Sequence, residues 1–245
     1  MASPNSSAPP PPAPSKVQVK TTGPVVVPPN INRLPIVTER LLLRPFDISD
    51  AEAVHVLRTQ PEVMQWTAVG TADKDMDESR TWLQRYLPPN DLQAYNFVIV
   101  DRGDGTNGDT AGELVGVGGV HHTRNGSGWP ECGYMLRKEY WGKGLATEFL
   151  RAFTKAWWAL PREEIRVEVN EETVGGRGEK NDSGELQVPE ILMAVIEASN
   201  VGSRRVLEKS GFREYKQWTE PDSRVGYEGS TATLVALLLE KAPDS

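Results

Sequence analysis

The sequence predicts a mixed fold of the α/β (α+β) class. Strand patterns and amphipathic helix patterns follow one another along the chain without a regular βαβ repeat. Of the 245 residues, 38% are hydrophobic and 25% are charged, which is typical of a globular domain with a buried core. No run of about 18 apolar residues occurs, so we expect no transmembrane helix and no membrane partner.

The first 35 residues differ in composition from the rest of the chain. They contain ten of the 19 prolines, three cationic residues and no acidic residue. Because apolar residues are too few to offset the entropy of ordering, we expect residues 1–35 to form a disordered proline-rich tail. Residues 36–245 are then a single domain, and its charge is -10 because the tail carries +3 of the net -7. An acidic body disfavours nucleic acid as a partner and favours cationic substrates.

Cys132 is the only cysteine, which excludes an intrachain disulfide and a zinc site made of several thiolates. The chain does not open with a charged segment followed by an apolar one, as a secretory signal does. We therefore expect a cytoplasmic protein. Cys132 itself is expected to be a buried structural thiol, because its neighbour Glu131 should point to the opposite face of a strand.

The elements of the first half are predicted from short apolar runs and helix-start signals. The Gly- and Asp-rich stretch 101–112 is expected to join two buried strands as a hairpin loop. It is not a calcium loop, because Gly103 and Gly105 occupy positions that need oxygen ligands. The predicted elements are a strand within Thr38–Pro45, a helix from about Ser49, a helix over Asp75–Leu87, and strands over Tyr95–Val100 and Leu114–Val120.

The second half contains the longest helical pattern of the chain. Leu145, Phe149, Phe153 and Trp157 recur every four residues, which predicts a helix with one apolar face. Gly211 is expected to end a later helix. The other predicted elements are strands over Glu131–Leu136, Ile165–Val169, Ile191–Ile196, Phe212–Thr219 and Thr231–Glu240, and a helix over Ser199–Ser210.

The segment that joins the strand Glu131–Leu136 to the long helix is the most informative one. Gly142 and Gly144 allow a tight turn that exposes backbone N–H groups, and the helix N-terminus and Lys143 add positive charge. The turn suits an anion such as a pyrophosphate, although an ordinary strand-to-helix turn is the alternative. The Gly-Lys-Ser/Thr ending of a Walker loop is absent. A dinucleotide-binding fingerprint fits poorly, because Thr147 stands at its third small-residue position.

Three motifs in order resemble the GNAT superfamily of acetyltransferases, and its RimJ/RimL-like branch in particular. Thr38 to Pro45 is similar to the start of that branch, Glu131 to Glu148 to the fourth strand and acetyl-CoA loop, and Asn200 to Phe212 to the Asn-x-x-Ser... Glu-Lys-x-Gly-Phe ending. The resemblance implies the GNAT fold, with a central mixed, mostly antiparallel sheet of about seven strands flanked by about four helices. It also implies an N-acetyltransferase that moves the acetyl group of acetyl-CoA to a primary amine by direct attack in a ternary complex.

The same resemblance implies which residues hold acetyl-CoA. They lie at the end of the fourth strand, in the glycine loop with the first helical turn, and in the Asn-x-x-Ser segment. These positions are Met135, Leu136, Arg137, Trp141, Gly142, Lys143, Gly144, Leu145, Ala146, Thr147, Asn200 and Ser203. The resemblance implies no metal.

The resemblance also implies catalytic roles for Glu131 and Ser203. Glu131 matches a glutamate that several relatives use as general base, often through water; the alternative is a strand-end carboxylate that faces solvent. Ser203 matches a serine that can donate a proton toward the CoA sulfur, and equally suits a helix-capping hydroxyl. Asn200 has the same two interpretations, pantetheine contact or helix cap.

The sequence departs from the family pattern at three places. Glu139 stands where Gln or Arg is usual, so its side chain should point away from the pyrophosphate. Leu207 replaces a tyrosine general acid, so Ser203 or water must supply the proton. Residues 171–188, rich in glycine and acids, are expected to form a mobile insertion. These departures also motivate an alternative function, a catalytically weak CoA-binding regulatory module of the same fold.

The acceptor amine is expected between residues 60–78 and the last hairpin, and it is a small molecule or a protein N-terminus. Monomer and homodimer both remain open. An acidic cluster near residue 75 could attract a cationic amine or favour a helix start. Candidate pocket walls, with core packing as the alternative, are Trp66, Trp82, Trp129 and Trp218.

Overall fold

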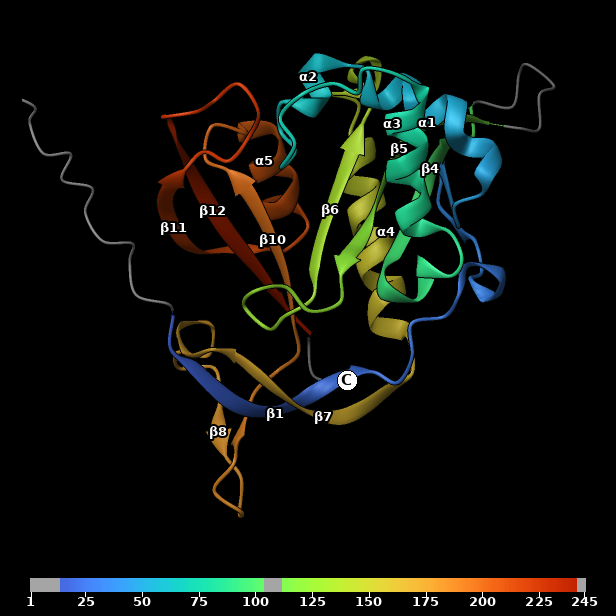
Figure 1. The fold of residues 1–245 in the computed structure, drawn as a ribbon. Coiled ribbons are helices and arrows are strands. Elements are labelled where there is room, and N and C mark those ends of the chain that lie inside the picture. The colour runs from blue at the N-terminus through green and yellow to red at the C-terminus, as the bar shows by residue number, and fades with distance from the viewer. Residues whose placement is uncertain (1–13, 104–111, 242–245) are drawn as a thin grey trace, which may run out of the picture.

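The computed structural model describes residues 14–103 and 112–241, so most of the predicted hairpin loop 101–112 lies outside the described residues. An eight-stranded mixed sheet in the order β11-β12-β10-β6-β5-β4-β3-β2 forms the body of the molecule (Figure 1). Its strands are β2 (Ile36–Val37), β3 (Leu41–Arg44), β4 (Tyr95–Asp101), β5 (Glu113–His122), β6 (Glu131–Leu136), β10 (Ile191–Glu197), β11 (Arg213–Pro221) and β12 (Thr231–Glu240).

Helices cover both faces of this sheet. They are α1 (Ala51–Arg58), α2 (Pro61–Met64), α3 (Met76–Leu83), α4 (Leu145–Ala159) and α5 (Val201–Lys209). The predicted fold class is confirmed. The central sheet has eight strands where about seven were expected, and the described residues hold five α-helices where about four were expected. The short elements β2 and α2 leave no pattern in the sequence. None of the helices in the described ranges is long and apolar enough to span a membrane.

The strand β4 shows how one element serves two cores. Phe97 and Ile99 pack in the cluster that includes α4 and α5, whereas Val98 and Val100 pack in the cluster that includes α1. Successive side chains of a strand point to opposite faces, so a strand covered by helices on both faces must be apolar throughout. This is why β4 is one of the clearest strand patterns in the sequence.

A second sheet, in the order β7-β1-β9-β8, lies below the first (Figure 1). Its strands are β1 (Lys16–Pro24), β7 (Arg162–Asn170), β8 (Glu179–Lys180) and β9 (Leu186–Gln187). β1 pairs with β7 along its whole length, and Val19 lies opposite Val167 in a buried cluster.

Two sequence expectations are corrected by this second sheet. Residues 16–35 are not a disordered tail, because residues 16–24 form β1; residues 1–13 lie outside the described residues. The expected insertion 171–188 holds regular structure, the turn of 3-10 helix Glu171–Thr173 followed by β8 and β9. The physical reason is that both segments pair with strands distant in the sequence: β1 pairs with β7 along its length, and with β9 where Lys20 lies opposite Gln187.

A buried ion pair joins α1 to the segment before α3. The Arg58 guanidinium donates to both carboxylate oxygens of Asp73, at 2.7 and 2.6 Å, and the Ser79 hydroxyl donates to the same carboxylate at 2.6 Å. Asp75 instead caps α3 by accepting from backbone N–H groups of its first turn. The acidic cluster is therefore used by the fold, and Asp73 is not available to an acceptor amine.

Replacement of Asp73 by alanine should be strongly destabilising. The change leaves the Arg58 charge buried without its partner, and we expect the free energy of unfolding to fall by about 3–5 kcal/mol. Urea unfolding followed by circular dichroism measures this. Asp77→Ala is the matched control, because that side chain is 88% exposed, and we expect a change within about 0.5 kcal/mol. Equal effects of the two variants would contradict the assignment.

Candidate active site

The groove of the molecule lies where β6 and β10 separate. These parallel strands pair at a single register, Glu131 opposite Met193. After this register β10 pairs with β12 alone, and β6 pairs with β5 alone. No other residue pair joins β6 to β10 in the described part of the chain. The edge of β6 that faces β10 is therefore left open between α4 and α5. An open edge presents backbone N–H and C=O groups that need partners.

The glycine loop stands at the end of this open edge. Gly142 and Gly144 have φ values of 74° and 80°, which favour glycine, and an added Cβ would meet nothing at Gly142. Gly144 is the N-cap of α4, and no side chain caps the helix. The amides of the first turn, at Leu145, Ala146 and Thr147, therefore remain available to an anion.

The Trp141 indole N–H donates to the carbonyl oxygen of Leu136 at 2.7 Å, which ties the loop back to β6. The ammonium of Lys143 lies 4.7 Å from the centre of the Tyr140 ring. Both contacts hold the loop in place, and residues 141–144 remain exposed to solvent. The predicted loop residues are thus brought together in one turn next to Met135 and Leu136.

The first sequence motif holds the loop from the other side. Arg40 donates to the Lys143 carbonyl at 2.9 Å and pairs with the Glu148 carboxylate at 2.6 Å, and the Thr38 hydroxyl donates to the same carboxylate. Partial burial works against ionisation, but these donors together hold the pKa of Glu148 below its ordinary value. Arg40 is a site residue that the sequence reasoning did not single out, although it lies within the quoted motif.

The Glu139 side chain is held by hydrogen bonds from two neighbouring side chains. Its carboxylate accepts from Arg137 at 2.7 Å and from Gln60 at 2.8 Å. Backbone and side-chain hydrogen bonds lower the pKa of Glu139 to about 2. Arg137 also pairs with Glu113, so its guanidinium is occupied and only its backbone is left for a ligand.

Glu131 lies at the opposite end of the open edge. Its carboxylate accepts from the Asn125 amide at 2.7 Å, and its other oxygen is 3.4 Å from Nε2 of His121. Burial would raise the pKa of Glu131, but the His121 and Asn125 contacts outweigh burial and lower it. The group is therefore a carboxylate at neutral pH. In the described ranges, no group of three or more His, Cys, Asp and Glu side chains could hold a metal ion.

Ser203 and Tyr134 bridge the gap between α5 and β6. The Tyr134 hydroxyl donates to Oγ of Ser203 at 3.3 Å, and burial, first of all, raises the pKa of Tyr134 to about 12. The side chain of Asn200 accepts from the Ser203 N–H at 3.0 Å and so caps α5. Tyr134 is the second site residue that sequence reasoning missed. Its signal was its place on β6, three residues after Glu131.

Several other candidates are part of the core. Leu207 is 2% exposed and packs with α4, so it has no route to a substrate. Burial raises the pKa of the Cys132 thiol, which keeps it protonated on the face of β6 opposite Glu131. Trp129 is 1% exposed, and Trp82 packs against the Arg58 guanidinium, so neither lines an acceptor pocket of this groove.

The two regions predicted to contact the acceptor meet at Arg224. This residue belongs to the loop between β11 and β12, and its guanidinium donates to the Gln65 carbonyl at 2.8 Å and to Glu197 at 2.7 Å. Trp66 and Tyr227 stand beside this contact in sequence and are partly exposed. The bridge joins the α2 end to the last hairpin.

Known proteins share this fold and this sequence pattern. The Acetyltransferase (GNAT) domain pattern matches residues 40–213. The uncharacterized N-acetyltransferase p20 of Bacillus licheniformis is 31% identical over 115 residues, which cover 45% of this chain and 58% of that relative. The match thus spans less than two thirds of the length of that curated relative.

Two solved structures illustrate the likeness of the fold. A GNAT-family acetyltransferase from Bacillus anthracis has a TM-score of 0.58 at 21% identity, covering 84% of this chain and 98% of its own. RimL, the ribosomal L7/L12 alpha-N-protein acetyltransferase in complex with coenzyme A, has a TM-score of 0.58 at 15% identity, covering 86% of this chain and 100% of its own.

The chain belongs to the GNAT acetyltransferase family. The family resemblance and the fold predicted from the sequence are confirmed. RimL, which shares the fold, has been solved in complex with coenzyme A.

The carboxyl group of Glu131 should titrate below its ordinary value of 4.5. Because the folded-state pKa is lowered, the stability linked to it is complete above about pH 4.5 and is lost as the pH falls through the folded value. Carbon-13 NMR titration of the Glu131 carboxyl measures this. Asn125→Ala removes one donor and should move the midpoint upward. A midpoint at or above 4.5 in the unmodified protein would contradict the described contacts.

Proposed function

We propose that the protein is an N-acetyltransferase that moves the acetyl group of acetyl-CoA directly to a primary amine. The observation that carries the proposal is the open edge of β6, with the free amides of α4 at one end and Glu131 at the other. Family membership supports the reaction class. The geometry supports the assignment of roles along the groove.

Acetyl-CoA would lie along this edge. The amides at Gly142 to Thr147, with the charges of Lys143 and Arg40 nearby, suit the pyrophosphate. The open edge of β6 beside Met135 and Leu136 suits pantetheine, since its amides can pair with that edge in a strand-like way. Glu148 does not oppose the anion, because Arg40 and Thr38 already occupy it.

The chemistry needs a base and an acid at the Glu131 end. The acceptor nitrogen attacks the thioester carbonyl, and Glu131, directly or through water, takes the proton that the nitrogen loses. The C–S bond then breaks, and the thiolate takes a proton from Ser203. Tyr134 donates to Ser203 and can replace that proton, because its raised pKa keeps it protonated before the step. Leu207 cannot supply the proton.

The acceptor would approach beneath the Arg224 bridge, between residues 60–78 and the last hairpin. The domain charge of -10 favours an acceptor that arrives as a cation. We propose a protein N-terminus or a small amine; RimL, which shares the fold, is named as an acetyltransferase of a protein N-terminus. We also propose a cytoplasmic location, since the single Cys132 forms no intrachain disulfide.

A negative charge placed in the glycine loop should weaken acetyl-CoA binding strongly. Gly144→Glu puts a carboxylate at the anion site and a side chain at a positive φ, so we expect the Kd measured by calorimetry to rise at least about tenfold. Gly184→Glu is a matched control. Gly184 has the same φ of 80° and open space around it, but lies in the β8–β9 turn. A normal Kd in Gly144→Glu would contradict the placement of the cofactor.

Glu131→Gln and Ser203→Ala should each lower kcat by about 10²–10⁴-fold, the usual contribution of a general base or acid. The Kd of acetyl-CoA should stay unchanged in Glu131→Gln, because Glu131 is not among the residues expected to hold the cofactor. Thiol release, screened over peptide N-termini, polyamines and amino sugars, first identifies an acceptor and then measures kcat. Ser183→Ala, in the β8–β9 turn, is the control. Normal acetyl-CoA binding without turnover on any amine would favour the alternative, a regulatory CoA-binding module.

A further inference from the structure

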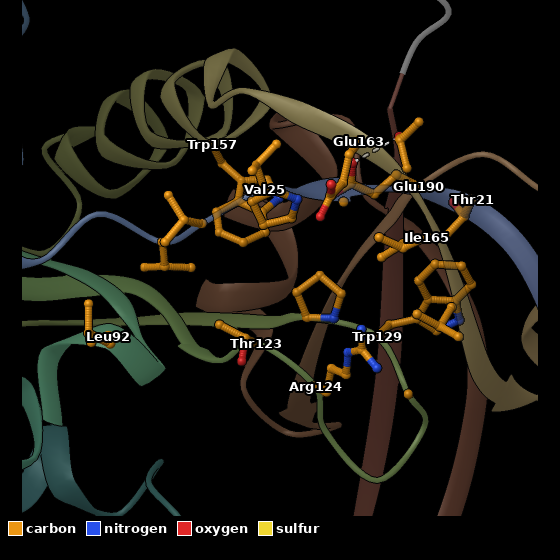
Figure 2. Close-up of a pocket in the computed structure, with 18 residues that line it drawn as sticks. Thr21, Val25, Leu92, Thr123, Arg124, Trp129, Trp157, Glu163, Ile165 and Glu190 are labelled. Carbon is orange, nitrogen blue, oxygen red and sulfur yellow. Dashed lines mark hydrogen bonds between the residues drawn. The ribbon is translucent and has the colours of Figure 1, made fainter.

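A separate cavity of about 350 Å³ lies between the β1–β7 ribbon and the loop that joins β5 to β6 (Figure 2). One wall is β1 with the residues that follow it, and the opposite wall is the β5–β6 loop, residues 123–130. Trp157 and Trp129 stand on opposite sides, as Figure 2 shows. The volume is at the small end of the range for ligand sites, about 300–1,000 Å³, and suits a molecule of amino-acid size.

Three buried polar atoms on the wall of this cavity have no hydrogen-bond partner in the described chain. They are Oε1 of Glu190, Nε1 of Trp157 and Oγ1 of Thr21. Glu190 is 3% exposed; its other oxygen accepts from Thr22 at 3.2 Å and lies 3.1 Å from Nε of Arg162. Buried donors and acceptors are costly when unpaired, and nearly all of them in folded proteins are satisfied. The wall of the cavity thus lacks a donor to Glu190 and an acceptor for Trp157.

The charged groups of the cavity are separated across it. Glu163 and Glu190 lie on the side of the ribbon, and Arg124 comes from the loop on the other side (Figure 2). Over residues 14–103 and 112–241, neither Glu163 nor Arg124 makes an ion pair or a side-chain hydrogen bond. A carboxylate pair on one side and a guanidinium on the other match a molecule with a positive end and a negative end.

We propose that this cavity binds a small zwitterion, an α-amino acid with an apolar side chain. Its ammonium group faces Glu190 and Glu163, and its carboxylate faces Arg124. The apolar side chain lies against Val25 and Ile165 of the ribbon wall. A partner for Glu190 removes the penalty of a buried free acceptor.

The site is distinct from the acetyl-CoA groove and does not depend on acetyl transfer. Its ribbon wall includes residues 21–27, which precede the part of the chain that matches the family pattern, residues 40–213. The loop that carries Arg124 also carries Asn125, which donates to the Glu131 carboxylate. An occupant therefore touches the loop that holds the proposed general base.

Calorimetry on the full-length chain tests the proposal with matched probes. L-leucine and L-phenylalanine supply both charged ends, their amides lack the carboxylate, and 4-methylpentanoate and 3-phenylpropanoate lack the ammonium. We expect one amino acid of the pair to bind at one site, and its amide and deaminated acid to bind at least about tenfold more weakly. No heat with either amino acid, or equal affinity for the one-charge analogues, would overturn the proposal and leave the cavity to water.

Variants locate the binding. Arg124→Ala and Glu190→Gln should each weaken amino-acid binding at least about tenfold, whereas Glu168→Gln, an exposed residue of β7 outside the cavity, should not. If Glu190→Gln does not fold, Glu163→Gln and Arg124→Ala decide, because both side chains are exposed. Unchanged affinity in Arg124→Ala overturns the assignment. The Kd of acetyl-CoA, measured in parallel, should be the same in all variants, which separates this proposal from the acetyltransferase proposal.

Discussion

The single register at which β6 meets β10 is the constraint on which the active groove depends. Each strand is paired on its outer side, β6 to β5 and β10 to β12, so the sheet consists of two halves joined at Glu131 and Met193. Had the pairing continued, backbone hydrogen bonds would have closed the edge and left no partner for a substrate. The Tyr134–Ser203 contact crosses the gap with side chains instead, and so keeps the halves in place without closing it.

The charges around the glycine loop determine that this end of the groove suits an anion. The domain is acidic, and Glu148 and Glu139 both lie close to the glycine loop. Arg40 forms an ion pair with Glu148, and Arg137 forms one with Glu139. Neither carboxylate is therefore left free to compete with an anion for the exposed amides and Lys143. The Thr38–Arg40 motif and the loop motif are separated by about a hundred residues but form one contact. The first motif therefore supports the anion site through direct contacts with the loop and with the first turn of α4.

Periodicity was sufficient for the long elements, because a helix with apolar residues every four positions or a strand buried on both faces leaves a local pattern. The strand β1 leaves only a short alternation, Val17 and Val19 between polar residues, and its burial depends on β7, about 145 residues away. The site divides in the same way. Its backbone parts, the positive-φ glycines and the free helix amides, follow from residue types at fixed spacing. Its side-chain partners, Asn125 on Glu131 and Tyr134 on Ser203, depend on which strands lie together, and the sequence does not state that.

The second sheet has a structural consequence for the groove, because it supports the loop behind Glu131. The Trp129 indole donates to Thr173 at 2.9 Å, and the Asn170 N–H donates to the Ser127 carbonyl at 2.9 Å. The Ser127 N–H in turn donates to the Asn125 side chain, whose amide holds the Glu131 carboxylate. Each link is a short hydrogen bond in a half-buried or buried setting, where such bonds restrict motion most. The second sheet and the turn that follows β7 thus reach, through one continuous set of contacts, the carboxylate proposed to accept the proton.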